Sequence, residues 1–164
     1  MCDSRCWLTI GAVSAGLAVA AGAFAAHGLD RRFHAMYAAQ KYEKKITLDG
    51  KQTVVSEIPL AEKYLADFKT GAEYQMYHAL ALIAVGLLAH LRASRMLAAA
   101  GSCFVGGSLA FSGGLYAYTL TAAKSIAIFV VPVGGLLFLA GWIVLAIAVC
   151  CCREAVRGLT RPAS

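Results

Sequence analysis

The residues best suited to chemistry form a polar group around the start of one apolar run. His27, Glu73, Tyr74, Gln75 and His78 combine two imidazoles with a carboxylate, a phenol and an amide. Such groups can carry a proton, hold a polar ligand or coordinate a metal ion. An ionisable side chain at membrane depth is by default a functional candidate. We favour a simpler interpretation, in which these side chains make hydrogen bonds that join two helix ends.

Helical spacing argues against a metal site in this group. At about 100° per residue, Tyr74, Gln75 and His78 share one side of a helix. Glu73 points about 140° away from His78 by the same rule. His27 ends one apolar run and His78 begins the next, so an up-and-down helix pair should place both near one membrane surface. We therefore expect the two histidines to meet, and we expect no metal or cofactor.

Catalytic motifs do not accompany these residues. The sequence lacks a G-x-S-x-G elbow, an H-E-x-x-H helix and a phosphate-binding G-x-x-x-x-G-K-[ST] loop. Its six cysteines lack C-x-x-C spacing, and we interpret them as small apolar fillers. S-acylation of Cys2, Cys6 and the Cys150–Cys152 group is the weaker alternative. The sequence therefore predicts a protein that is not an enzyme.

The composition indicates that these residues are positioned by a bilayer protein. Of the 164 residues, 60% are hydrophobic, whereas soluble domains have about half. The net charge of +6 would suit nucleic acid in a soluble protein, but here the basic residues lie between and after uncharged runs. We expect the lipid bilayer as the partner, and no nucleic acid.

Four uncharged runs are long enough to cross about 30 Å of hydrocarbon. They predict spanning helices near residues 6–27, 74–91, 96–119 and 126–151. The expected fold is all-α: a polytopic membrane protein that forms one four-transmembrane-helix bundle over residues 1–164. A signal peptide is the competing interpretation of the first run, because Ala23-Phe24-Ala25 resembles a cleavage site. Three further apolar segments favour a span instead.

The charged segment 28–72 should lie outside the bilayer. Asp49-Gly50 is a turn signal beside the β-prone Thr53-Val54-Val55, which favours a small hairpin. After Pro59, apolar residues recur at helical spacing from Leu60 to Thr70. This spacing predicts a short amphipathic helix along the interface before the second span.

Small residues indicate where helices pack closely. Gly106, Ala110 and Gly114 lie four residues apart in the third run, a spacing that lets neighbouring backbones approach. The partner of such a face is another span, a second copy of the chain or a different membrane protein.

Topology follows from the short connections. An even number of spans places both termini on one side, and the arginines of the short 92–95 link and of the tail after the last span favour the cytoplasm. The first connection holds eight basic residues, but these are spread out and mixed with acids. We expect a plasma membrane protein, located in the inner membrane of a bacterium.

Four sequence blocks together resemble one family. They are Gly22–Gly28, Tyr74–Leu82, Phe111–Tyr116 and Pro132–Trp142, in that order along the chain. The chain resembles the small integral membrane proteins grouped as domain of unknown function 423, also called the transmembrane protein 256 family. The resemblance implies a four-helix membrane protein with no established activity.

Two classes of function are compatible with these observations. One is a structural or accessory membrane protein, and the other is a carrier or channel for a small or proton-coupled solute. Coupled carriers commonly use an ionisable residue near the bilayer midplane. We expect none at that depth in the four runs, so we favour the accessory class.

Overall fold

The computed structural model describes residues 4–48 and 51–159. Its helices include three single turns of π-helix: η1 and η2 each join two α-helices, and η3 precedes the last α-helix. In chain order the elements are α1 (Ser4–Phe24), η1 (Ala25–Leu29), α2 (Asp30–Tyr37), β1 (Lys41–Leu48), β2 (Lys51–Pro59), α3 (Leu60–Leu91), α4 (Arg95–Gly107), η2 (Ser108–Ser112), α5 (Gly113–Thr121), η3 (Ile126–Val130) and α6 (Val131–Leu159).

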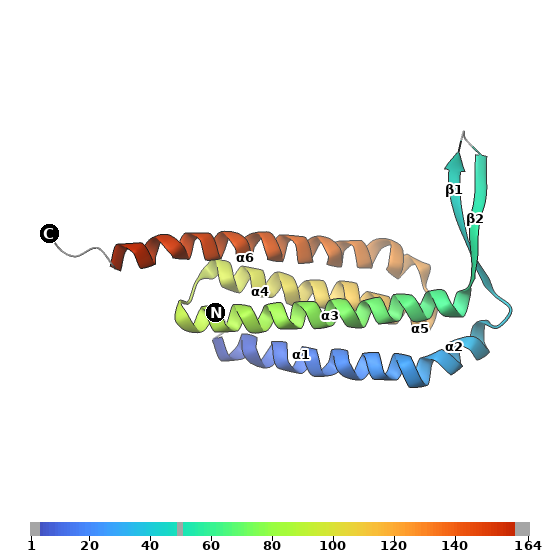
Figure 1. The fold of residues 1–164 in the computed structure, drawn as a ribbon, viewed down its shortest axis with the longest axis horizontal. Helices are drawn as coiled ribbons and strands as arrows, with labels where there is room; N and C mark the ends of the chain where they lie inside the picture. Colours follow the sequence, from blue (N-terminus) through green and yellow to red (C-terminus); the bar gives the residue numbers. More distant parts are fainter. Residues whose placement is uncertain (1–3, 49–50, 160–164) are drawn as a thin grey trace.

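The helices and π-turns form four long rods, α1–η1–α2, α3, α4–η2–α5 and η3–α6. The rods lie side by side (Figure 1). Each rod contains a helix long and apolar enough to cross a membrane. Their ranges are Ser4–Tyr37, Leu60–Leu91, Arg95–Thr121 and Ile126–Cys150. The predicted all-α bundle with four candidate spans is therefore confirmed. The β1–β2 hairpin projects from one end, and the start of α1 lies toward the other (Figure 1).

The helices extend further into the first connection than the sequence indicated. The helix that begins as α1 continues through η1 and α2 to Tyr37, and α3 begins at Leu60. The stretch Leu60–Thr70 is helical as expected, but it is the first third of the second span rather than a separate interfacial helix. Tyr64 and Phe68 are buried against other helices instead of lying on a bilayer surface. The connection outside helices therefore comprises about residues 38–59 rather than 28–72.

The predicted hairpin is present in that connection. β1 and β2 pair antiparallel, with Lys41 opposite Pro59 and an irregularity between Lys44 and Lys45. The expected Asp49-Gly50 turn lies outside the described residues. At the base, the Leu60 amide donates to the Gln40 carbonyl at 2.9 Å.

Two clusters of buried side chains hold the rods together. One includes Trp7, Leu82, Val85, Phe104 and Phe138, and joins all four rods. The other lies toward the hairpin end. It is rich in aromatic rings and includes Leu29, Phe33, Tyr37, Tyr64, Phe68 and Tyr118. The bundle thus continues as a packed core beyond the uncharged part of α3.

Close packing at glycines brings helix pairs together. A Cβ at Gly86 of α3 would lie 2.8 Å from Leu8 of α1, and one at Gly107 of α4 would clash with the Phe138 ring of α6. Of the small residues singled out from the sequence, Gly114 packs on Val131 and Gly106 faces Leu137. Ala110 is half-buried in η2 between them. The face of these residues therefore lies largely against α6.

Candidate functional site

The structure separates the two histidines that the sequence placed together. The amide nitrogen of Gln75 donates to the Ser14 carbonyl at 2.9 Å, which fixes how α1 lies along α3. His27 is exposed and thirteen residues beyond Ser14, or about 20 Å at roughly 1.5 Å per residue. The expectation that His27 meets His78 is therefore wrong. The reason is the early start of α3, because η1 and α2, which follow α1, pack beside Tyr64 rather than beside His78.

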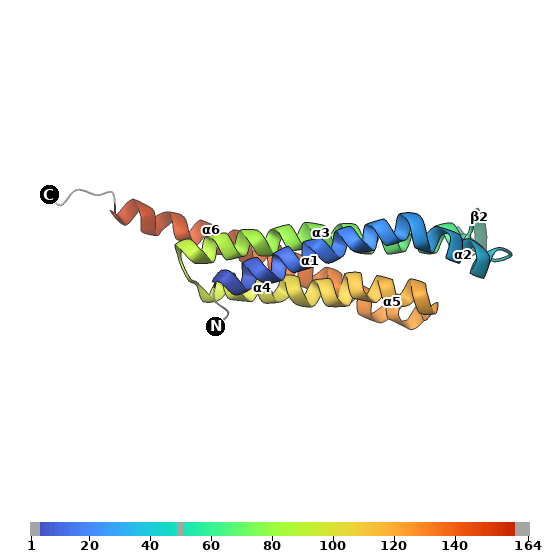
Figure 2. The ribbon, with the colours of Figure 1, turned by 90° about the horizontal axis from the view of Figure 1, so that it is seen from below.

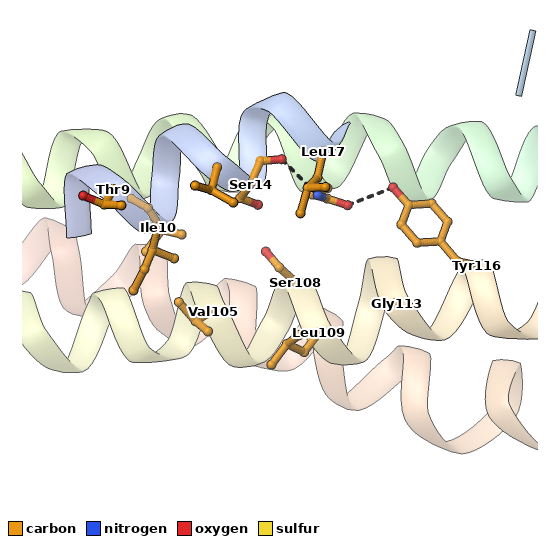
Figure 3. A pocket seen from close by; sticks show the side chains of 12 residues that line it. Thr9, Ile10, Ser14, Leu17, Val105, Ser108, Leu109, Gly113 and Tyr116 are labelled. Carbon is orange, nitrogen blue, oxygen red and sulfur yellow. Dashed lines mark hydrogen bonds between the residues drawn. The ribbon is translucent and has the colours of Figure 1, made fainter. Parts of the chain in front are cut away.

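Gln75 joins three of the four rods. Besides its bond to Ser14 of α1, its side-chain oxygen accepts a hydrogen bond from the Tyr116 hydroxyl of α5 at 2.9 Å. Figure 3 shows both bonds as dashed lines at one end of a cavity. The sequence did not indicate this pairing, because a tyrosine in an apolar run and a backbone carbonyl such as that of Ser14 carry no signal of their partners.

His78 is a buried polar side chain with both ring nitrogens engaged. The residue is 4% exposed. Nδ1 lies 2.7 Å from the Tyr74 carbonyl oxygen, and the indole Nε1–H of Trp142 donates to Nε2 at 3.3 Å. Since an indole only donates, Nε2 is the acceptor and Nδ1 carries the proton. The network therefore fixes one neutral tautomer.

The ring of His78 also lies at an unexpected depth. It stacks on Phe138, with centroids 3.3 Å apart and planes 4° from parallel. Phe138 is halfway along the uncharged interval between Lys124 and Arg153. His78 is thus level with the middle of the fourth span, which corrects the expectation that no ionisable residue lies at such depth.

The remaining members of the predicted group face outward. Glu73 is exposed, and the Tyr74 side chain is 40% exposed beside Phe111, with ring centroids 4.8 Å apart. Only Gln75 and His78 turn into the bundle, and they bond to different partners. In the part of the chain that the structure describes, no three His, Cys, Asp or Glu side chains are grouped as metal ligands would be. Among the cysteines, Cys103 is half-buried with a free thiol.

Two cavities flank these residues. The first, which we call the α1–α4 cavity, has a volume of about 480 Å³ and is lined by α1, α3 and the third rod. The second, the α3–α6 cavity, has a volume of about 830 Å³, and His78 and Trp142 lie in its wall. Both are lined mainly by apolar side chains, so their chemistry suits apolar rather than ionic molecules.

Four rods with an aromatic core and internal polar bonds define a small multi-pass membrane protein. The model of the family described as "Protein of unknown function (DUF423)" matches residues 21–135. The chain belongs to this family, as the four sequence blocks indicated.

Relatives of similar length occur in several bacteria. The chain is 38% identical over 140 residues to a UPF0382 membrane protein of Haemophilus influenzae, covering 85% of this chain and 90% of the relative. It is 34% identical over 145 residues to the UPF0382 membrane protein YwdK of Bacillus subtilis, covering 88% and 95%. No solved structure matches the chain.

Proposed function

We propose that the protein is a structural or accessory component of the membrane, without enzymatic activity. The observation that supports this best is that two polar side chains inside the bundle, Gln75 and His78, bond to other helices. Gln75 joins α1, α3 and α5, and His78 joins α3 to α6. Hydrogen bonds of this kind stabilise packing between membrane helices. A proton carrier would need a nitrogen that exchanges its proton, whereas both nitrogens of His78 are engaged.

A carrier for a small or proton-coupled solute is the second candidate. Its support is the depth of His78, because buried ionisable groups near the midplane commonly form proton and substrate pathways. The two candidates differ in whether His78 moves a proton or only holds helices together.

Proteoliposomes with an imposed pH gradient would separate these functions. We expect proton flux equal to that of protein-free vesicles, both for the native chain and for His78→Gln. Saturable flux that disappears in His78→Gln would overturn the accessory function in favour of the carrier.

We further propose that the protein lies in the plasma membrane with both termini in the cytoplasm. The bacterial relatives support the location in a cell membrane, and the arginines of the 92–95 link support the orientation. Alkaline phosphatase fused after residue 164 should be inactive, and the same reporter inserted at the hairpin should be active. The reverse pattern would contradict the orientation. The small-residue faces leave association with a second copy or another membrane protein as a further proposal, which cross-linking in native membranes would test.

A further inference from the structure

The α1–α4 cavity arises because α1 diverges from the third rod. Near the start of α1, Trp7 packs directly on Gly101, where a Cβ would lie 2.8 Å from the indole ring. Figure 2 shows that α1 then crosses toward α3 and away from α5. The space left by this divergence has α3 as its floor, with Gln75 and Leu82 facing it.

The mouth of this cavity opens toward lipid. Three apolar side chains of its rim, Val13, Leu17 and Leu109, are 57%, 60% and 72% exposed. They belong to candidate membrane spans, where exposed apolar surface faces hydrocarbon. A molecule that enters here therefore comes from the bilayer rather than from water.

The interior of the cavity carries unused hydrogen-bonding capacity. The Ser108 Oγ is buried and has no partner among the described residues. Figure 3 shows this hydroxyl directed into the space below Ser14 and Leu17. Leaving a buried hydroxyl unpaired is unfavourable, because it has lost its bonds to water. Gln75 forms one bond through each of its amide atoms, so a second N–H and a second lone pair stay available.

Ser108 also begins the π-helical turn η2. Single π-turns within α-helices occur frequently at functional sites. The turn places Ser108 and Leu109 in the wall of the α1–α4 cavity. The unpaired hydroxyl and the irregular turn are thus found at the same point of the wall.

We propose that the α1–α4 cavity binds an uncharged, single-chain lipid whose head carries a hydroxyl or carbonyl group. The hydrocarbon chain of the lipid lies among Ile10, Val105 and the rim residues, and the head of the lipid bonds to Ser108 and Gln75. The lining contains no charged side chain, so an ionic head would be buried without a partner. A volume of about 480 Å³ falls within the usual ~300–1,000 Å³ of small-molecule sites.

The α3–α6 cavity provides a natural contrast. It is larger, but its buried polar group, His78, already bonds through both nitrogens. Its other polar groups include the phenols of Tyr74 and Tyr77, which are 40% and 55% exposed, so among the described residues its wall offers no unpaired buried group to a head group. Of these two cavities, the α1–α4 cavity is therefore the one expected to select a hydroxyl.

A photoactivatable fatty alcohol with a diazirine in its chain would test the proposal in nanodiscs. We expect labelled peptides from α1 and from the region of Val105 and Leu109. An alkane and an alkyltrimethylammonium of equal length, carrying the same diazirine, should label this region much less. Equal labelling by all three probes would overturn the proposal, as would labelling spread evenly over the lipid-facing surface.

Two glycines offer a matched pair of variants. A Cβ on Gly113, in the α1–α4 cavity, meets only the Ser108 carbonyl at 3.9 Å, and one on Gly135, in the other cavity, meets only Phe111 at 3.9 Å. Gly113→Leu should abolish alcohol labelling of α1, whereas Gly135→Leu should leave it unchanged. Retained labelling in Gly113→Leu would contradict the proposal.

Ser108→Ala tests the head group without filling the cavity. Loss of one hydrogen bond should weaken competition by unlabelled alcohol roughly three- to tenfold. The midpoint temperature of thermal unfolding, measured without the alcohol, should not be lowered. Unchanged competition would refute the role of Ser108. Cross-links between two copies through Val13 or Leu109, in place of lipid labelling, would show that a second chain covers the cavity and would refute the lipid site.

Discussion

Trp142 donates its indole hydrogen to Nε2 of His78 at 3.3 Å. This bond joins the second and fourth spans near the middle of the bundle. The His78 ring also stacks on Phe138, and the Trp142 ring meets Phe104 edge-on. A hydrogen bond between membrane helices contributes about 0.6 kcal/mol on average and at most ~1.7 kcal/mol. Its role is therefore to fix the relative position of the helices more than to supply most of the stability.

We expect His78 and Trp142 to be coupled in a double-mutant cycle. Trp142→Phe keeps an aromatic ring but removes the donor, and His78→Ala removes the acceptor. The loss of unfolding free energy in the double variant should be smaller than the sum of the two single losses by about 0.6 kcal/mol or more. The reason is that the second change finds the bond already absent. Chemical unfolding in detergent measures this, and strictly additive losses would show that the bond does not form.

His27 and His78 should behave as independent sites. They lie about 24 Å apart along the helix direction, at roughly 1.5 Å per residue, because Ser14, not His27, lies beside Gln75 and His78 is a further three residues away from His27. The losses of unfolding free energy caused by His27→Ala and by His78→Ala should add in the double variant to within about 0.5 kcal/mol. His27→Ala alone should have little effect, since His27 is exposed. Coupling above that limit, measured by the same unfolding method, would restore the arrangement in which the histidines meet.

Gln75→Leu should destabilise the bundle more than Tyr116→Phe. The first change removes two interhelical bonds, and the second removes one. At about 0.6 kcal/mol for each bond, and with the Tyr116 hydroxyl left unpaired, we expect a loss of about 1–3 kcal/mol for Gln75→Leu and roughly half of that for Tyr116→Phe. Tyr77→Phe is the matched control, because it also removes a phenol hydroxyl, but from a residue that is 55% exposed. Equal losses in all three variants would exclude Gln75 as a junction.

The spans could be predicted because uncharged runs of sufficient length are a direct requirement of the hydrocarbon core. The register between α1 and α3 could not be predicted from the sequence. It depends on where α3 begins, and charges such as Glu62, Lys69 and Glu73 mark solvent or headgroup contact without ending a helix. All three are exposed on α3, so the helix tolerates them while its other side stays buried.

The partners of the polar residues were hidden for a related reason. Trp142 is in an apolar run, and its sequence context says only that a buried indole needs an acceptor. Its partner is one turn beyond Tyr74 on another helix. The acceptor for Gln75 is a backbone carbonyl, which every residue possesses. The types of polar residue were therefore visible in the sequence, but their pairing required the packed helices.

Two neighbouring glycines of α6 should respond oppositely to the same substitution. A Cβ at Gly134 would overlap the backbone of Phe111, whereas one at Gly135 has ordinary space around it, with Phe111 Cδ2 at 3.9 Å. Backbone cannot move aside as a flexible side chain can, so Gly134→Ala should force α6 away from η2 and cost about 1–3 kcal/mol. Gly135→Ala should be neutral or stabilise by up to about 1 kcal/mol, because alanine loses less backbone entropy in a helix. Unfolding curves of both variants in one detergent provide the comparison. A neutral Gly134→Ala would mean that η2 and α6 are not in close contact, and the packing of the third rod on the fourth would need revision.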